Sequence, residues 1–139
     1  MREPYGLLAD FVAVVHFLYV LFAVGGLIFI LVGARLSVEA VRNPWFRIIH
    51  LVAVGLVALE AATGFVCPLT DWEYDLRRLA GETVDRDLSF VARLVHAVIF
   101  YDLPGWVFTI AHIAFGLLVA ATFVLVPPKF AGKRKMEDP

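Results

Sequence analysis

The sequence contains little cysteine, almost no net charge and none of the short motifs of familiar enzyme classes. Its 139 residues include one cysteine, Cys67, which excludes an internal disulfide and a cysteine-based zinc cluster. The formal net charge is −1, so no overall field attracts nucleic acid, and we expect no nucleic-acid partner. The chain has no HExxH, CxxCH or CxxC motif, no glycine-rich phosphate loop and no convincing serine–histidine–aspartate order.

Long apolar runs are what the sequence has in abundance. Hydrophobic residues make up 61% of the chain, a larger share than soluble domains use. Three runs exceed the length needed to cross about 30 Å of hydrocarbon, where a helix satisfies the backbone. They lie between Asp10 and Arg35, between Arg47 and Asp71, and between Asp102 and Lys129. We predict an all-α membrane protein, with one transmembrane domain over residues 1–128 and a basic, disordered tail over 129–139.

Two shorter segments are expected to form helices outside the hydrocarbon. The stretch from Leu88 to Tyr101 has 14 residues, or about 21 Å as a helix, which fits an interfacial or re-entrant helix better than a span. The segment WEYDLRRLAG is expected to form an amphipathic surface helix, with its last glycine at the C-terminal end. Thr70 or Asp71 is the expected cap of that helix, after Pro68 has ended the second span.

The distribution of charge favours three spans over four. The loop from Arg35 to Arg47 holds three arginines and one acid, and the tail after Pro128 is basic. The stretch from Pro68 to Asp102 holds four basic and seven acidic side chains. Basic loops tend to stay on the cytoplasmic side of a membrane. Three spans put the first loop and the tail inside, with the N-terminus outside and the C-terminus cytoplasmic. The alternative of four spans would put the first loop and the tail on opposite sides of the membrane.

Three ionisable side chains lie at a similar depth in three different spans. Counted from the outer end of each span, His16, Glu60 and His112 lie about 9, 10 and 12 Å deep. His96 lies on the short helix above them. An ionisable group in hydrocarbon is costly, so this agreement in depth indicates a shared polar site in the outer half of the bundle. Small residues on the same faces, such as Gly116 four residues after His112, indicate close packing against neighbouring helices.

Several chemistries use histidine and carboxylate, and the residues leave them open. His16, Glu60 and His96 are the candidate ligands of a transition metal, and His16, His96 and His112 are the candidate ligands of haem b. A His–Glu pair alone suits a proton relay or a quinone site. Each histidine can instead act only as an interhelical hydrogen-bond donor, while Glu60 stays protonated or pairs with a histidine, most naturally His16.

Three further side chains are given simpler interpretations. Cys67 is a candidate metal ligand or redox thiol, although a small packing residue is the preferred interpretation. Glu73 completes a capping-box pattern with Thr70, and it lies four residues before Arg77, an ion-pair spacing that contributes roughly a few tenths of a kcal/mol. His50, near the inner end of its helix, is expected to be an interfacial side chain.

A central segment and two histidines carry a resemblance to a known family. The segment is HLVAVGLVALEAATGFVCPLTDWEYDLRRLAG, from His50 to Gly81, in which CPLT is the most specific part, and the histidines are His16 and His96. On these residues the chain resembles a family of small bacterial membrane proteins known only as a domain of unknown function. The resemblance implies an inner-membrane location and transfers no activity. It implies counterparts, in other members, of His16, His50, Glu60, Cys67 and His96, whereas a counterpart of His112 is not expected throughout the family.

Two hypotheses for the function follow from these observations. In the first, the chain is a small redox-linked or metal-linked membrane protein with an outer-leaflet His/Glu site for a metal, haem or a proton. In the second, it is a non-catalytic accessory or structural subunit of a membrane complex, and its polar residues fix helix packing or bind a partner. The expected partners are the lipid bilayer and another membrane protein.

Overall fold

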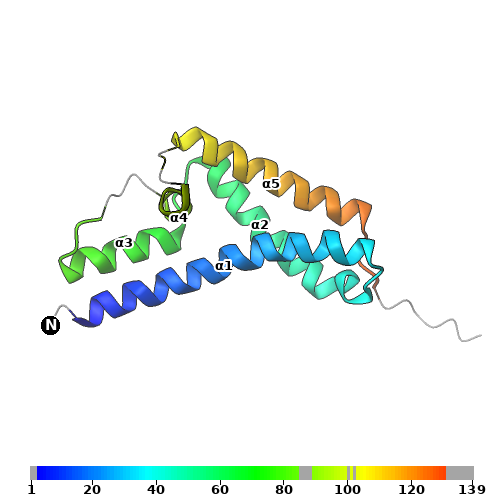
Figure 1. Ribbon diagram of the computed structural model, residues 1–139, viewed down its shortest axis with the longest axis horizontal. Coiled ribbons are helices and arrows are strands. Elements are labelled where there is room, and N and C mark those ends of the chain that lie inside the picture. Colours follow the sequence, from blue (N-terminus) through cyan, green and yellow to red (C-terminus); the bar gives the residue numbers. More distant parts are fainter. Residues whose placement is uncertain (1–2, 85–88, 100, 102, 131–139) are drawn as a thin grey trace, which may run out of the picture.

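The computed structural model describes residues 3–84, 89–99, 101 and 103–130, and these form helices joined by short connections (Figure 1). In chain order the helices are α1 (Glu3–Arg35), the short 3-10 helix η1 (Glu39–Arg42), α2 (Pro44–Thr63), α3 (Pro68–Ala80), α4 (Phe90–Ile99) and α5 (Gly105–Leu125). No strand occurs in the described residues, so the predicted all-α class is confirmed.

Three of the helices, α1, α2 and α5, are long and apolar enough to cross a membrane. The ten residues of α4 make about 15 Å of helix, which is too short for a span. The predicted membrane protein with three spans and short accompanying helices is therefore confirmed. In the most apolar window of each span, 17–22% of the residues are buried inside the chain, which leaves most of the apolar surface for lipid.

The first helix is longer than a membrane crossing requires. Its 33 residues extend for about 50 Å, against about 30 Å of hydrocarbon. It begins at Glu3, well before Asp10, where the apolar run starts. Figure 1 shows α3 along the N-terminal part of α1, while α2 and α5 lie beside the C-terminal part. The first turns of α1 and the whole of α3 therefore form a layer at one end of the spans.

A small apolar core joins the three spans. Leu27 of α1, Val54 of α2 and Val119 of α5 are buried against one another. The helices α2 and α5 approach closely at Gly116, where an added Cβ would lie 2.7 Å from the Cβ of Ala58. The prediction that Gly116 marks a close helix contact is confirmed, because a larger residue there would push the two helices apart.

The junction between α2 and α3 differs from the prediction. The helix α2 ends at Gly64, which adopts the left-handed conformation with φ of 76°, so Pro68 does not end the span. Pro68 is instead the first residue of α3, where its missing N–H and fixed φ are favourable. Cys67 therefore occupies the N-cap position and makes no side-chain capping bond. The prediction that Thr70 or Asp71 caps this helix is wrong.

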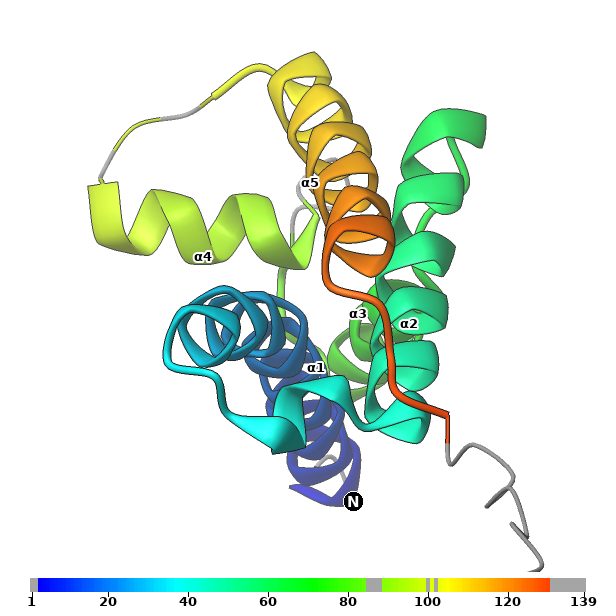
Figure 2. The same ribbon diagram turned by 90° about the vertical axis from the view of Figure 1, so that its right-hand side faces the viewer.

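The helices α3 and α4 are connected differently to the bundle. As predicted, α3 ends at Gly81, whose φ is 83°. The helix α4 begins after Ser89, whose Oγ accepts a hydrogen bond from the backbone N–H of Ala92 at 3.1 Å. In Figure 2, α4 projects across α1 and away from the other helices. Side chains near its N-terminal end, Phe90 and Arg93, contact α1 and α3.

At the other end of the bundle, an arginine joins α2 to α5. Arg47 is 2% exposed, and its Nη2 donates to the carbonyl oxygens of Thr122 at 2.6 Å and Val126 at 2.9 Å. These are carbonyls of the last turn of α5, where the helix dipole also favours a cation. The Thr122 carbonyl also accepts from the backbone N–H of Val126 at 2.9 Å, so Arg47 adds a second donor there and supplies one to the Val126 carbonyl.

The histidine one turn further along α2 is fully buried. His50 is 0% exposed, and its Nε2 donates to the carbonyl oxygen of Ala23 on α1 at 2.9 Å. The sequence suggested an interfacial side chain, but the ring lies between helices because Gly26 leaves it room. A Cβ on Gly26 would lie 2.4 Å from the His50 Cδ2 atom. His50 thus fixes the spacing of α1 and α2.

Candidate functional site

Charged and polar side chains from three helices meet where α3 lies along α1. They are Asp10 and His16 on α1, Glu73 and Arg77 on α3, and Arg93 on α4, and we call these five residues the polar cluster. The polar cluster connects α4 to the two helices beside it. Its position and its chemistry make it the candidate functional site.

Glu73 is the centre of the polar cluster and is 1% exposed. Arg77 donates from Nε to one carboxylate oxygen at 2.9 Å, and Arg93 donates from Nη2 to the other at 2.7 Å. The pair with Arg77 is the ion pair that the spacing predicted. Burying a carboxylate is costly unless opposite charges and hydrogen bonds surround it. The two arginines offset that cost, and one of them belongs to α4.

Arg77 holds the charged layer together from the side of α3. Besides Glu73, it contacts Asp10 of α1 at 3.1 Å and Glu82 after α3 at 3.0 Å. Burial by itself lowers the pKa of Arg77, but the hydrogen bonds to these three carboxylates outweigh it, so its pKa is raised above the ordinary value. The guanidinium is therefore permanently charged, and it ties α1 and α3 together.

His16 lies against the attachment of α4 and is 6% exposed. Its ring stacks on Phe90, the first residue of α4, with 4.2 Å between centroids and 19° between planes. The charges of Glu73 and Arg93 both act on the imidazole. Its Nδ1 atom is buried without a hydrogen-bond partner, as is the Nε atom of Arg93. His16 is therefore a titratable group in direct contact with the element that depends on this ion pair.

Glu60 lies in a different environment from His16. It is half-buried on α2, and its charge acts on Cys67 and on Tyr19 of α1. Tyr19 itself donates from its hydroxyl to the carbonyl oxygen of Ala53 on α2 at 2.6 Å. The contacts of the described side chains thus group Glu60 with Cys67 and Tyr19, and group His16 with α3 and α4.

The environment of Cys67 makes it a weak nucleophile. Burial raises the pKa of its thiol, backbone N–H groups of Leu69 and Thr70 lower it, and the neighbouring Glu60 carboxylate raises it again. The net shift is upward, so the thiol is mostly protonated at neutral pH. Reactive cysteines lie in electropositive surroundings instead, so this environment favours the packing interpretation of Cys67.

The two remaining candidate histidines lie on other helices than His16. His96 is on α4 with an exposed side chain. His112 is half-buried on α5, and its Nδ1 donates to the carbonyl oxygen of Phe108, one turn earlier in the same helix, at 2.6 Å. Within the part of the chain that the structure describes, no group of three or more His, Cys, Asp or Glu residues is placed to hold a metal ion.

Sequence patterns did not single out Asp10 and Arg93, the two residues through which α1 and α4 contact α3 in the polar cluster. Asp10 and Arg93 contact residues 67 and 20 positions away, so no local spacing indicates their partners. The sequence feature that could have indicated them is that each charged residue stands beside an apolar run: Asp10 precedes such a run, and Arg93 lies within one. A lone charge beside apolar residues needs a partner when it is buried, which applies to Arg93 at 28% exposed but not to Asp10 at 67% exposed.

Comparison with known proteins identifies one family. A family model described as Protein of Unknown function (DUF2784) matches residues 6–128. No curated protein and no solved structure matches the chain. The matched range covers α2, α3, α4 and α5, nearly all of α1 and every residue of the polar cluster.

Proposed function

Because the chain belongs to the family Protein of Unknown function (DUF2784), which supplies no activity, we propose its function from the polar cluster. The chain is a multi-pass protein of the bacterial inner membrane in which the polar cluster has a proton-linked role. In this proposal, the charge of His16 controls whether α4 is docked on α1 and α3. The proposal retains the proton-linked form of the His/Glu hypothesis and moves the carboxylate from Glu60 to Glu73.

The observation that carries the proposal is the position of His16. The imidazole is nine-tenths buried, has a free Nδ1 and touches α4 through Phe90. It lies within electrostatic reach of Glu73 and Arg93, which form the ion pair that holds α4. Histidine is the side chain whose charge changes most readily near physiological pH.

The proposed mechanism is competition for one carboxylate. A proton on His16 places a positive charge beside Glu73 and Arg93, so it attracts the carboxylate and repels the guanidinium. Arg77 pairs with Asp10 and binds one carboxylate oxygen of Glu73, so His16 and Arg93 compete for the other oxygen. Protonation therefore weakens the Glu73–Arg93 pair and favours release of α4. Deprotonation restores the docked arrangement.

The experiment measures α4 docking directly as a function of pH. Spin labels at exposed Leu18 on α1 and Val98 on α4, in a background with Cys67→Ala, report the separation of the two helices. Lowering the pH from about 8 to about 5, across the titration of imidazole, is expected to lengthen or broaden the distance distribution. His16→Phe keeps a ring to stack on Phe90 but cannot titrate, so it is expected to abolish the pH response.

His112→Phe is the matched control, because His112 is a half-buried histidine on α5 whose hydrogen bond to Phe108 lies within its own helix. It should retain the full pH response of the wild-type chain. A pH response that survives in His16→Phe, or the absence of any response in the wild type, would rule out the proton-linked role. The accessory-subunit hypothesis would then be preferred.

The metal and haem forms of the hypothesis have their own measurement. Elemental analysis and an absorption spectrum of the purified protein test the metal set His16, Glu60 and His96 and the haem candidates His16, His96 and His112. A Soret band, or stoichiometric zinc, iron or copper that His16→Phe removes, would replace the proton-linked proposal with a cofactor site.

The proposed orientation places the N-terminus and the polar cluster outside, and the C-terminus in the cytoplasm. Support comes from the basic loop around η1 and from Lys129, which lie at the same end of the three spans, and from the basic composition of the sequence that follows Lys129. Reporter fusions after Gly81 and at the C-terminus are expected to report opposite sides of the membrane. Fusions that report the same side would refute the three-span orientation.

A further inference from the structure

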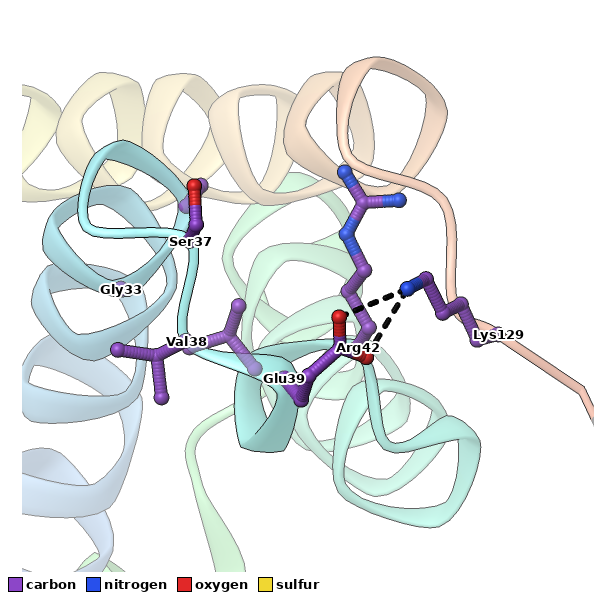
Figure 3. Close-up of a pocket in the computed structure, with 8 residues that line it drawn as sticks. Gly33, Ser37, Val38, Glu39, Arg42 and Lys129 are labelled. Atoms are coloured by element: carbon purple, nitrogen blue, oxygen red, sulfur yellow. Dashed lines mark hydrogen bonds and ion pairs between the residues drawn. The ribbon is translucent and has the colours of Figure 1, made fainter.

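A polar cavity of about 220 Å³ lies at the end of the bundle opposite the polar cluster (Figure 3). It is open to one side and is lined by the end of α1, by η1 and by Lys129, which follows α5. Its polar lining side chains are Ser37, Glu39, Arg42 and Lys129. The volume is several times the space that a single water molecule needs, so the cavity can hold a small polar group with its hydration.

The cavity is built by a tight reversal of the chain after α1. Ser37 adopts a left-handed conformation with φ of 57°, and the backbone N–H of Val38 donates to the carbonyl oxygen of Gly33 at 2.8 Å. This brings η1 against the last turn of α1. A Cβ on Gly33 would lie 2.2 Å from Cγ1 of Val41, so the glycine is what allows η1 to lie so close. The cavity is therefore formed by well-packed backbone.

Lys129, the first residue of the predicted tail, forms the remaining side of the cavity lining. The backbone N–H of Lys129 donates to the carbonyl oxygen of Arg42 at 2.8 Å. Its Nζ contacts both carboxylate oxygens of Glu39, at 2.8 and 2.9 Å. The hydrogen bond and the charge of Lys129 lower the pKa of the Glu39 carboxyl below its usual range. The carboxyl is therefore ionised at neutral pH, and the backbone hydrogen bond to Arg42 keeps Lys129 beside the cavity, because an ion pair between exposed side chains is weak.

Arg42 adds a positive charge that the Lys129–Glu39 ion pair does not neutralise. In the described part of the chain its guanidinium forms no ion pair, whereas Lys129 and Glu39 neutralise each other. Figure 3 shows the Arg42 side chain extending from η1 beside Lys129. The cavity thus has an excess of one positive charge. A guanidinium presents two parallel N–H donors, which match two oxygens of a phosphate.

The position of the cavity relative to the membrane indicates where such an anion would come from. All three spans have an end here, α1 at Arg35, α2 at Pro44 and α5 at Leu125. The cavity therefore lies at the level where hydrocarbon gives way to lipid headgroups. Basic residues at this level attract anionic lipids at about 1 kcal/mol each.

From these observations we propose that the cavity binds the phosphate group of an anionic phospholipid headgroup. Arg42 makes the bidentate contact, and Lys129 and the Ser37 hydroxyl donate to the remaining oxygens. The site is separate from the polar cluster. The proposal does not depend on the orientation of the chain, because reversing the chain changes only which leaflet supplies the lipid. Free inorganic phosphate has the same chemistry, and the experiment distinguishes the two sources.

The test is the thermal stabilisation of the full chain by added lipid in neutral detergent. A ligand that binds the folded state raises the unfolding temperature with a dependence on its concentration that gives an apparent affinity. Dioleoylphosphatidylglycerol is expected to stabilise the protein more than dioleoylphosphatidylcholine does. Arg42→Gln is expected to weaken the phosphatidylglycerol affinity about fivefold, equivalent to about 1 kcal/mol. Glu39→Gln releases Lys129, so it is expected to strengthen the affinity.

Arg35→Gln is the matched control, because Arg35 is an exposed arginine at the same end that does not line the cavity. It is expected to leave the phosphatidylglycerol affinity within about twofold of the wild type. An equal loss in Arg35→Gln, or no preference for the anionic lipid, would overturn the site. Equal stabilisation by inorganic phosphate alone would overturn the lipid assignment. The unfolding temperature of each variant without lipid confirms that it is folded.

Discussion

Replacing Glu73 by glutamine is expected to destabilise the protein by about 2–3 kcal/mol. The substitution keeps the shape of the side chain but removes the charge that two arginines share. Removing one member of a buried ion pair costs about 3–5 kcal/mol, since the partner is left without compensation. The expected loss is smaller here because Arg77 and Arg93 are 19% and 28% exposed, and Arg77 retains two other carboxylates.

The measurement is the free energy of unfolding in detergent, with Glu82→Gln as the control. Glu82 also pairs with Arg77, but its side chain is 47% exposed, so the control is expected to lose less than about 0.5 kcal/mol. The spin-label distance between α1 and α4 should also lengthen in Glu73→Gln at every pH, because Arg93 has lost its anchor. Equal losses in the two variants would mean that burial of Glu73 has no special role.

Replacing Gly26 by alanine is expected to cost about 3 kcal/mol, at the upper end of the range for overpacked cores. The added Cβ would lie 2.4 and 2.6 Å from the Cδ2 and Nε2 atoms of His50, both well inside van der Waals contact. The ring cannot move away easily, since it is 0% exposed and its Nε2 donates to Ala23. The clash therefore has to be relieved by moving α1 away from α2.

Gly25→Ala provides the comparison, because a Cβ at Gly25 has nothing within 4 Å. It changes the same residue type one position earlier in the same helix, and it is expected to be neutral or slightly stabilising, as alanine favours helix over glycine. In a double variant with His50→Ala, the Gly26→Ala substitution should cost much less, which is the coupling expected of residues in contact. Similar unfolding temperatures for Gly25→Ala and Gly26→Ala would show that the helices do not meet at Gly26.

Local pattern was sufficient for the parts of this protein that depend on neighbouring residues. The three spans follow from the length of the apolar runs, which must satisfy their own backbone in lipid. The Glu73–Arg77 pair follows from the i,i+4 spacing on a helix, and the end of α3 at Gly81 follows from the freedom of glycine at positive φ. The ion pair and the helix end are decided within about one or two helical turns, and each span is decided within one continuous apolar run. Pro68 is the exception, since a proline both ends and begins helices, and Gly64 had already ended α2.

The sequence by itself thus determined the class of the protein, the number of its spans and the residues that carry charge within them. The tertiary structure alone decided which of these residues meet. Depth along the spans led to the expectation of a shared site of His16, Glu60 and His112, but depth does not specify the rotation of a helix or the neighbour that it faces. Docking of α3 along α1 put His16 beside Glu73 and Arg93, and left Glu60 with Cys67 and Tyr19. The energy of a buried charge depends on partners 20 to 67 residues away, and only the packing of whole helices brings those partners together.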